Sequence, residues 1–222
     1  MELRPYQRAA VEAVYEYLRT RDDNPCVVIP TAGGKTPILA TICRDAVLTW
    51  QGRVLVLAHV KELLVQAVNK LAQVDPGLAM HVGIYSAGLG SRDTTHSIIV
   101  AGIQSVYQRA AELGAFDLII VDEAHLIPES GDGRYRTFLA AAKVVNPNVR
   151  VIGMTATPYR MSSGLICHSN NILNQVCYEI GVRELIVAGW ICPVRSKGGK
   201  READFSKIKI RAGEFDSTEI EY

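Results

Sequence analysis

The stretch Pro30-Thr31-Ala32-Gly33-Gly34-Lys35-Thr36 joins a short apolar run, 26–29, to a helical pattern, and this arrangement indicates the fold class. Small residues let the backbone curl so that its N–H groups converge on phosphate oxygens, and the helix N-terminus adds partial positive charge. Lys35 would then reach the β- and γ-phosphates of a nucleotide, and the Thr36 hydroxyl would hold Mg²⁺. The residues expected at the phosphates are Thr31, Ala32, Gly33, Gly34, Lys35 and Thr36.

The same stretch also has a simpler interpretation, a glycine-rich turn that carries a surface lysine. The general phosphate-loop pattern, G-x-x-x-x-G-K-[ST], has glycine at the position where this chain has Ile29. A second motif is therefore needed to choose between a turn and a nucleotide site.

That second motif is Val121-Asp122-Glu123-Ala124-His125, at the end of the apolar run 118–121. A carboxylate at a strand tip can hold Mg²⁺, which we assign to Asp122, and Glu123 can act as general base on the attacking water. A solvated acidic loop is the alternative for this segment alone. The two motifs together, on separate strands, predict ATP binding and hydrolysis.

Strand and helix patterns alternate along the chain, and the apolar residues of the strands run continuously, as in strands covered on both faces. This alternation predicts an α/β fold with a mostly parallel sheet and helices on both faces. Ligands of such sheets bind at the carboxyl ends of the strands, so the two motifs should face each other. The expected strands are 26–29, 54–58, 81–85, 98–101, 118–121 and 149–153. The expected helices are 6–18, 35–48, 61–74, 105–113 and 135–145.

The composition excludes several classes of protein. With 48% hydrophobic and 21% charged residues in 222, the chain can form a packed core, which argues against disorder. The net charge of +1 excludes a polycation but leaves room for a local basic stripe. No apolar run approaches the ~20 residues of a membrane span, and the first residues do not resemble a signal peptide, so we expect a cytoplasmic protein without a membrane partner.

Five widely spaced cysteines form no Cys-x-x-Cys pair, which favours reduced thiols in a cytoplasm over a zinc knuckle or a disulfide framework. A metal site built from Cys167, His168, Cys177 and Cys192 is the minor alternative, because their spacing follows no known ligand pattern.

Taken together, the motifs resemble those of the first RecA-like P-loop NTPase domain of superfamily-2 DEAD/DEAH-box helicases over about residues 3–195. Residues 122–125 spell DEAH, and Thr155-Ala156-Thr157-Pro158 resembles the motif that links ATP state to nucleic-acid grip. The resemblance implies that His125 couples the two sites through Thr155 or Thr157, although His125 could instead be a catalytic base. The catalytic residues implied are Lys35, Asp122, Glu123 and His125.

Three further segments carry the resemblance. Leu3-Arg4-Pro5-Tyr6-Gln7 is similar to the Q-type motif, which implies that Gln7 and Arg4 contact adenine. The stretches 54–63 and 101–106 resemble strand-end motifs that contact the nucleic-acid backbone. The nucleic-acid candidates are His59, Lys61, Gln104 and Ser105, with Arg92 and Arg109 in or near neighbouring loops. A solvated loop residue is the alternative for each.

A narrower likeness, to RadD-like bacterial and prophage DNA-repair helicases, rests on LRPYQ, RVLVLAHVKELLVQ, NPNVRVIGMTATPYR and LIVAGWICP. It implies a DNA helicase or translocase in repair or recombination that acts on single-stranded or forked DNA. The usual phosphate loop of the superfamily has glycine where this chain has Ala32, and a Cβ there limits positive φ.

Residues 196–222 begin with a polar, glycine-rich run typical of a linker, so we expect 1–195 to be the ATP-binding domain and 196–222 to lead into a second domain. The resemblance implies that a second RecA-like domain, absent from these residues, supplies an arginine finger, and that residues 1–222 alone turn over ATP weakly. The alternatives are an ATPase-silent nucleic-acid-binding module, an RNA helicase, and a small-molecule P-loop kinase.

Overall fold

A computed structural model describes residues 2–59, 67–69, 71–73, 75–129, 131, 133–160, 164–193, 210–211 and 214–215. The chain divides into two compact units, Met1–Ile191 and Cys192–Tyr222. In the second unit β11 (Ile210–Arg211) pairs antiparallel with β12 (Glu214–Phe215). The predicted linker run, 196–202, lies outside the described residues.

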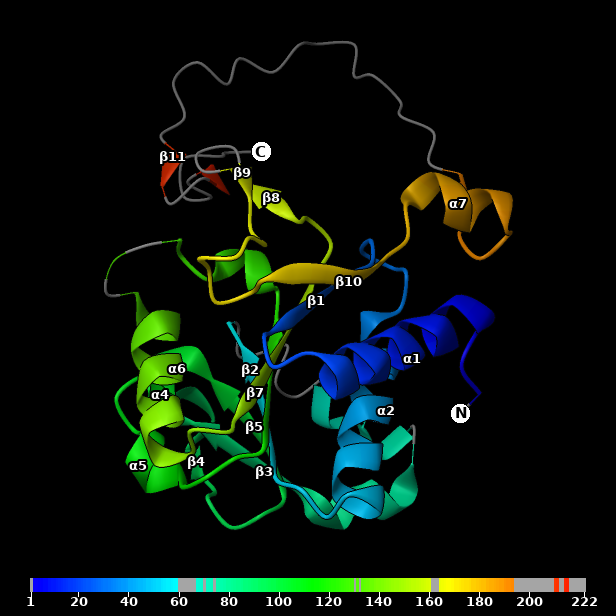
Figure 1. Cartoon of the computed structure of the whole chain (residues 1–222). Coiled ribbons are helices and arrows are strands. Elements are labelled where there is room, and N and C mark those ends of the chain that lie inside the picture. The colour runs from blue at the N-terminus through cyan, green and yellow to red at the C-terminus, as the bar shows by residue number, and fades with distance from the viewer. Residues whose placement is uncertain are drawn as a thin grey trace, which may run out of the picture. The chain divides into compact units, whose positions relative to one another are not determined.

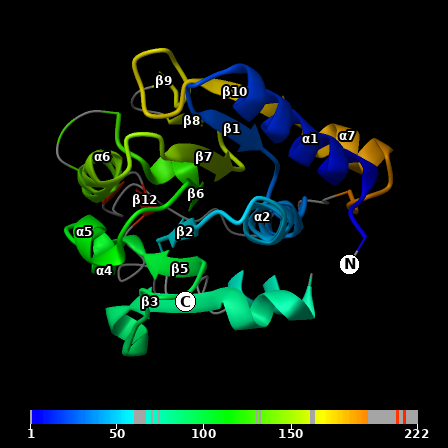
Figure 2. The same ribbon diagram turned by 60° about the horizontal axis from the view of Figure 1, so that its bottom comes forward.

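The first unit is built on one eight-stranded sheet in the order β10-β1-β7-β6-β2-β5-β3-β4 (Figures 1 and 2). Every pairing in it is parallel except that between β3 and β4. The strands are β1 (Pro25–Val28), β2 (Val54–Ala58), β3 (Val82–Ser86), β4 (Ser91–Arg92), β5 (Ile98–Gly102), β6 (Leu118–Asp122), β7 (Arg150–Thr155) and β10 (Gln175–Glu179). The predicted α/β fold with a mostly parallel sheet is confirmed.

Helices cover both faces of the sheet, as Figure 2 shows. On one face lie α1 (Pro5–Thr20) and α2 (Lys35–Arg44), and on the other α4 (Ile103–Val106), α5 (Ala110–Leu113) and α6 (Arg134–Val145). Side chains of each strand alternate between two buried clusters, so that β2 sends Val54 and Val56 to one and Leu55 and Leu57 to the other. This double burial explains the continuous apolar runs.

Two predicted helices differ from the structure, and a third lies only partly within the described residues. The 35–48 pattern forms α2 and then a π-helical turn, η1 (Asp45–Thr49). The 105–113 pattern is split into α4 and α5, because Arg109 leaves the helical region with φ −123° and ψ 26°. Of the 61–74 pattern, only 67–69 and 71–73 are described, and both are helical.

Several elements were not predicted, most importantly edge strand β10 and helix α7 (Val182–Val187). The others are a two-stranded hairpin, β8 (Tyr159–Arg160) with β9 (Gly164–Leu165), strand β4, and the 3₁₀ turns η2 (Pro76–His81), η3 (Ala87–Leu89) and η4 (Ala124–Leu126). Across the described part of the chain, no helix combines the length and the apolar character needed to span a membrane.

Candidate functional site

The glycine-rich loop follows β1 and ends where Lys35 begins α2. Its glycines are required by packing. A Cβ on Gly33 would lie 2.6 Å from Cγ2 of Ile29, and Gly34 has φ 83° with no room for a Cβ beside the Gln7 amide. The loop is therefore held in one compact shape at the carboxyl end of the central strands.

Ala32 adopts φ 65°, in the left-handed region that its Cβ disfavours. This conformation costs roughly 1 kcal/mol for a residue with a Cβ. The exposed alanine therefore does not prevent the turn, and the loop carries this strain.

The acidic motif lies next to this loop. Asp122 is the last residue of β6, and Glu123 turns the chain with φ 51°. The Lys35 Nζ is 3.2 Å from Oε1 of Glu123, and the lysine side chain is only 12% exposed. The two motifs that the sequence places on separate strands therefore meet.

Asp122 sits in an environment that disfavours its own charge. Burial, followed by the nearby Glu123 carboxylate, raises the pKa of Asp122, and the Lys35 ammonium opposes this shift only in part. The Tyr135 hydroxyl is also buried, and it has no hydrogen-bond partner among the described residues. Burial and then the charges of Asp122 and Glu123 raise the pKa of that phenol.

These groups fit a divalent cation. Carboxylate and hydroxyl oxygens are the donors that Mg²⁺ prefers, and a cation would compensate the excess negative charge beside Asp122. Asp122 and Thr36 are the residues that would hold it, since Thr36 lies in the first turn of α2.

A chain of polar contacts leads away from the acidic motif. Nδ1 of His125 lies 3.3 Å from Oε2 of Glu123 and 3.0 Å from Oγ1 of Thr155, the last residue of β7. The Thr155 hydroxyl is fully buried and accepts a hydrogen bond from the N–H of Thr157 at 3.1 Å. Arg160 donates to the carbonyl oxygens of His125, at 2.6 Å, and Ile127.

The N-terminal segment contacts the backbone carbonyls of Gly33 and Gly34 in the glycine-rich loop. Tyr6 donates its hydroxyl proton to the carbonyl of Gly33 at 2.6 Å. The Gln7 amide accepts from the N–H of Arg4 at 2.9 Å and donates to the carbonyl of Gly34 at 3.3 Å. Gln7 is buried and keeps one N–H and one lone pair beyond these bonds, so the expected adenine contact stays a prediction.

The nucleic-acid candidates follow strand β2, which is the neighbour of β6, and strand β5, which lies on the other side of β2. His59 and Gln104 are exposed at this carboxyl edge, and the Ser105 hydroxyl accepts from the N–H of Ala87 at 3.0 Å. Lys61 lies outside the described residues. In or near the neighbouring loops, Arg92 belongs to β4, and Arg109 forms an ion pair with Glu112 at 2.8 Å.

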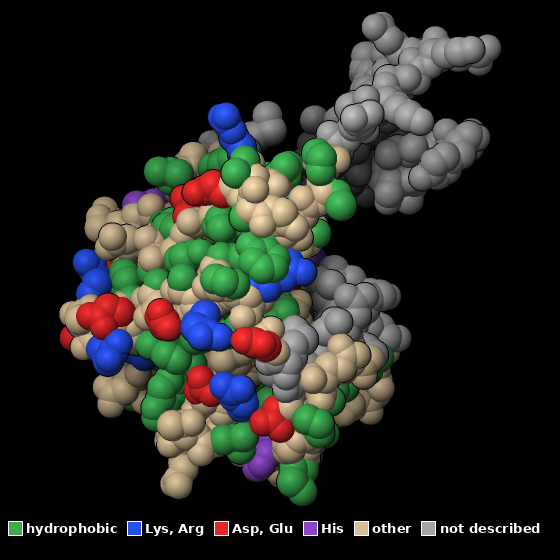
Figure 3. Space-filling model, turned by 90° about the vertical axis from the view of Figure 1, so that its right-hand side faces the viewer, with side chains coloured by type: hydrophobic (Ala, Val, Ile, Leu, Met, Phe, Trp, Pro, Cys, Tyr) green, Lys and Arg blue, Asp and Glu red, His purple; other side chains and the backbone are tan. Residues whose placement is uncertain are grey.

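On the face that carries α1 and α7, basic and acidic side chains are interspersed (Figure 3). A backbone-tracking groove needs a stripe of one sign, and this face shows none among the described residues.

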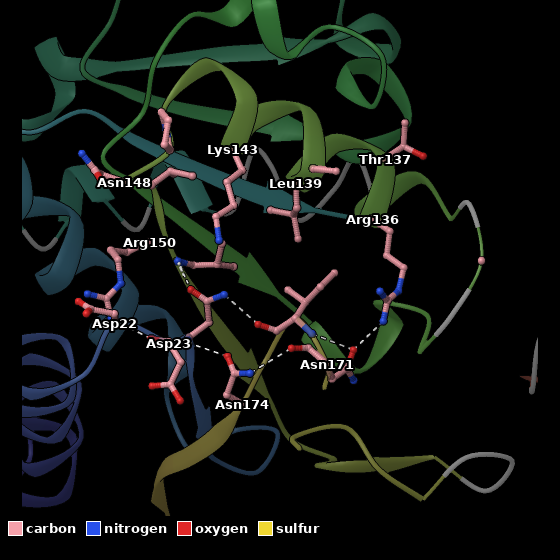
Figure 4. Close-up of a pocket in the computed structure, with 17 residues that line it drawn as sticks. Asp22, Asp23, Arg136, Thr137, Leu139, Lys143, Asn148, Arg150, Asn171 and Asn174 are labelled. Atoms are coloured by element: carbon pink, nitrogen blue, oxygen red, sulfur yellow. Dashed lines mark hydrogen bonds between the residues drawn. The ribbon is translucent and has the colours of Figure 1, made fainter. Parts of the chain in front are cut away.

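A cavity of about 1100 Å³ lies at the opposite, amino end of the sheet (Figure 4). Its polar side chains mostly hold the backbone in place. Arg150 donates to the carbonyls of Leu18, Arg21 and Asp23, and Arg136 donates to that of Pro128. This cavity therefore has the character of a structural junction.

Two groups at the site have no clear signal in the sequence. Trp190 packs beside Arg4, 186 positions away along the chain, and the Tyr135 hydroxyl faces no described partner near the acidic motif. Trp190 lies in the segment LIVAGWICP, whose resemblance to other helicases implies no role for this residue.

Comparison with known proteins connects this geometry to a family. Residues 1–160 match the family described as "Type III restriction enzyme, res subunit". The chain is 30% identical to the IRC3 protein of Saccharomyces cerevisiae, named as an ATP-dependent helicase, over 96% of this chain and 31% of that protein. The chain thus spans less than a third of this relative's length.

Two solved structures share the fold. The UvsW helicase from bacteriophage T4 superposes with a TM-score of 0.62 and 17% identity, over 80% of this chain and 60% of that chain. The second is a nuclease-deletion mutant of the type ISP restriction-modification enzyme LlaGI, in complex with a DNA substrate mimic. It superposes with a TM-score of 0.64 and 18% identity, over 86% of this chain and 21% of that chain.

Proposed function

Because the chain belongs to the family of type III restriction enzyme res subunits, we propose that it is the ATP-binding domain of a motor that moves along DNA. The observation that carries the proposal is the 3.2 Å contact between Lys35 Nζ and Glu123 Oε1. A glycine-rich loop with its lysine and an acidic strand tip are the two halves of a triphosphate site.

Each residue of the site has a defined task in this proposal. Lys35 and the N–H groups at the start of α2 bind the β- and γ-phosphates. Thr36 and Asp122 would hold Mg²⁺, which would neutralise phosphate charge. Glu123 orients the attacking water and accepts its proton.

The Lys35–Glu123 ion pair joins the glycine-rich loop to the acidic motif. A bound triphosphate offers Lys35 several charged oxygens, which compete with the single carboxylate of Glu123. Glu123, once released, is available to a water molecule. His125, which contacts both Glu123 and Thr155, transmits this change to Thr157 and to the Arg160 segment.

We propose that the motor moves along DNA and contacts it through His59, Lys61, Gln104 and Ser105. The position of the described members of this set at the carboxyl edge of the sheet supports this proposal, as does the DNA substrate mimic bound by the type ISP enzyme.

A second RecA-like domain would complete the ATP cleft. We place the motor in cytoplasmic DNA repair or recombination, on single-stranded or forked DNA.

Two other functions compete with this one. The strained Ala32 favours an ATPase-silent nucleic-acid-binding module. An RNA helicase would use the same fold. Turnover by the two-domain protein, measured with single-stranded DNA and with RNA, separates these: stimulation by DNA supports our proposal, RNA alone would indicate an RNA helicase, and no turnover would favour the silent module.

Calorimetry with ATP tests the site itself. We expect Mg²⁺-dependent binding that Lys35→Ala weakens by about 100-fold, because a charge-assisted phosphate contact is lost. Lys143→Ala, which removes an exposed lysine at the amino-end cavity, is the matched control and should bind normally. Equal affinities for wild type and Lys35→Ala would refute the assignment.

A further inference from the structure

Two segments far apart in sequence contact the glycine-rich loop at Gly33. Tyr6 contacts Gly33 from the N-terminal side. From the C-terminal side, α7 places Leu185, which is fully buried, so that its Cδ1 lies 3.2 Å from where a Cβ on Gly33 would be. The loop is therefore clamped between the two ends of the first unit.

Trp190, just after α7, extends this clamp to Arg4. The Trp190 N–H donates to the carbonyl of Leu185 at 2.9 Å, which fixes the turn that ends the helix. The Arg4 guanidinium carbon lies 5.1 Å from the centre of the Trp190 ring, and Arg4 Nη1 donates to the Trp190 carbonyl at 3.3 Å. The same Nη1 donates to the Tyr6 hydroxyl at 3.4 Å.

These contacts leave much of the Arg4 head group free. Arg4 is exposed, and within the described part of the chain its Nε and Nη2 protons have no acceptor. A guanidinium is planar, and its five N–H groups form a fixed fork. A group held in this way suits a flat aromatic ring with nitrogen acceptors, which is the chemistry of a purine base.

We propose that Trp190 is a positioning residue of the nucleotide site, which holds Arg4 against the purine base of the bound nucleotide. This inference rests on the proposed function. It adds α7 and Trp190, which lie beyond the family match at residues 1–160, to the nucleotide pocket. Trp190 itself is 38% exposed, and the contacts described here hold it through Leu185, Arg4 and Tyr6.

A comparison of two ligands, ATP and inorganic tripolyphosphate, tests the inference by calorimetry with Mg²⁺ and the 222-residue chain. Trp190→Ala should weaken ATP binding by about tenfold and leave tripolyphosphate binding unchanged, because only the base contacts Arg4. Trp190→Phe keeps an aromatic face and should recover most of the ATP affinity. Trp50→Ala, which removes the other exposed tryptophan, is the matched control and should match wild type.

Equal losses for both ligands would show that Trp190 only shapes the phosphate loop, and no loss would remove it from the site; either result overturns the inference. If wild type binds neither ligand, the proposed function itself fails.

A second measurement decides the matter if Trp190→Ala does not fold. The Trp50→Phe variant leaves Trp190 as the chain's single tryptophan, since the sequence has two. ATP should change its fluorescence, and tripolyphosphate should not. Identical responses to the two ligands, or none, would contradict the inference.

Discussion

The two ends of the parallel sheet both gather polar side chains, but they use them differently. At the amino end Arg150 and Asn24 bind neutral backbone groups, such as the carbonyl of Asp23 and the N–H of Val151. At the carboxyl end Lys35 and Glu123 pair with each other. The backbone at the carboxyl end is also strained, with positive φ at Ala32 and Glu123.

This difference indicates that the polar groups at the amino end stabilise the fold, whereas those at the carboxyl end can exchange their partners for a ligand. The hydrogen bonds from Arg150 to three backbone carbonyls hold the start of β7 to the segment that precedes β1. The Lys35–Glu123 pair can be broken by a better anion, and the excess of carboxylates there can be met by a cation. Polar clusters that can exchange partners are therefore the better candidates for function.

The largest expected effect is that of Glu123→Gln on turnover by the proposed two-domain protein. The amide cannot accept a proton, so turnover should fall by about 100-fold or more, whereas ATP binding should persist. A phosphate-release assay beside equilibrium ATP binding measures both. Retained turnover would remove Glu123 from the role of general base.

Arg150→Ala should show the opposite pattern. It leaves the carbonyls of Leu18, Arg21 and Asp23 without their donor, so we expect a loss of about 2 kcal/mol in the free energy of unfolding. ATP affinity under native conditions should be unchanged. Urea unfolding and calorimetry measure the two quantities, and an ATP affinity that falls while stability holds would show that the ends of the sheet are not functionally distinct.

The smallest expected effect is that of Asp122→Asn on the melting temperature, and this effect should depend on pH. Because burial raises the folded-state pKa of Asp122, the folded chain binds the proton more tightly than the unfolded one, and stability is lost as pH rises through this range. The asparagine variant avoids this loss. Its melting temperature should match wild type in acid and exceed it by a few degrees near neutral pH.

Thermal scans between about pH 4.5 and about pH 7.5 measure that difference. The same variant should lose the Mg²⁺ dependence of ATP binding. A gap between the two melting temperatures that closes as pH rises would contradict the assigned environment of Asp122.

Local pattern was enough to predict the central strands, because residues such as Leu55 and Val56 are buried on opposite faces and leave an unbroken apolar run. It failed for β10, an edge strand whose ends, Gln175 and Glu179, are exposed and polar. The break at Arg109 was also missed, since the apolar periodicity continues across it.

At the candidate site, too, one contact could be predicted from the sequence and another could not. The meeting of Lys35 and Glu123 follows from parallel topology, which places both strand ends at one edge. The contact between Arg4 and Trp190 joins residues 186 positions apart, and no local spacing encodes it.

A crystal structure of the chain with Mg²⁺ and a non-hydrolysable ATP analogue would show whether a triphosphate binds between the two motifs. We expect a triphosphate between the glycine-rich loop and Asp122, with Lys35 moved from Glu123 to the phosphates. A triphosphate bound in the amino-end cavity, with the Lys35–Glu123 pair intact, would contradict this expectation.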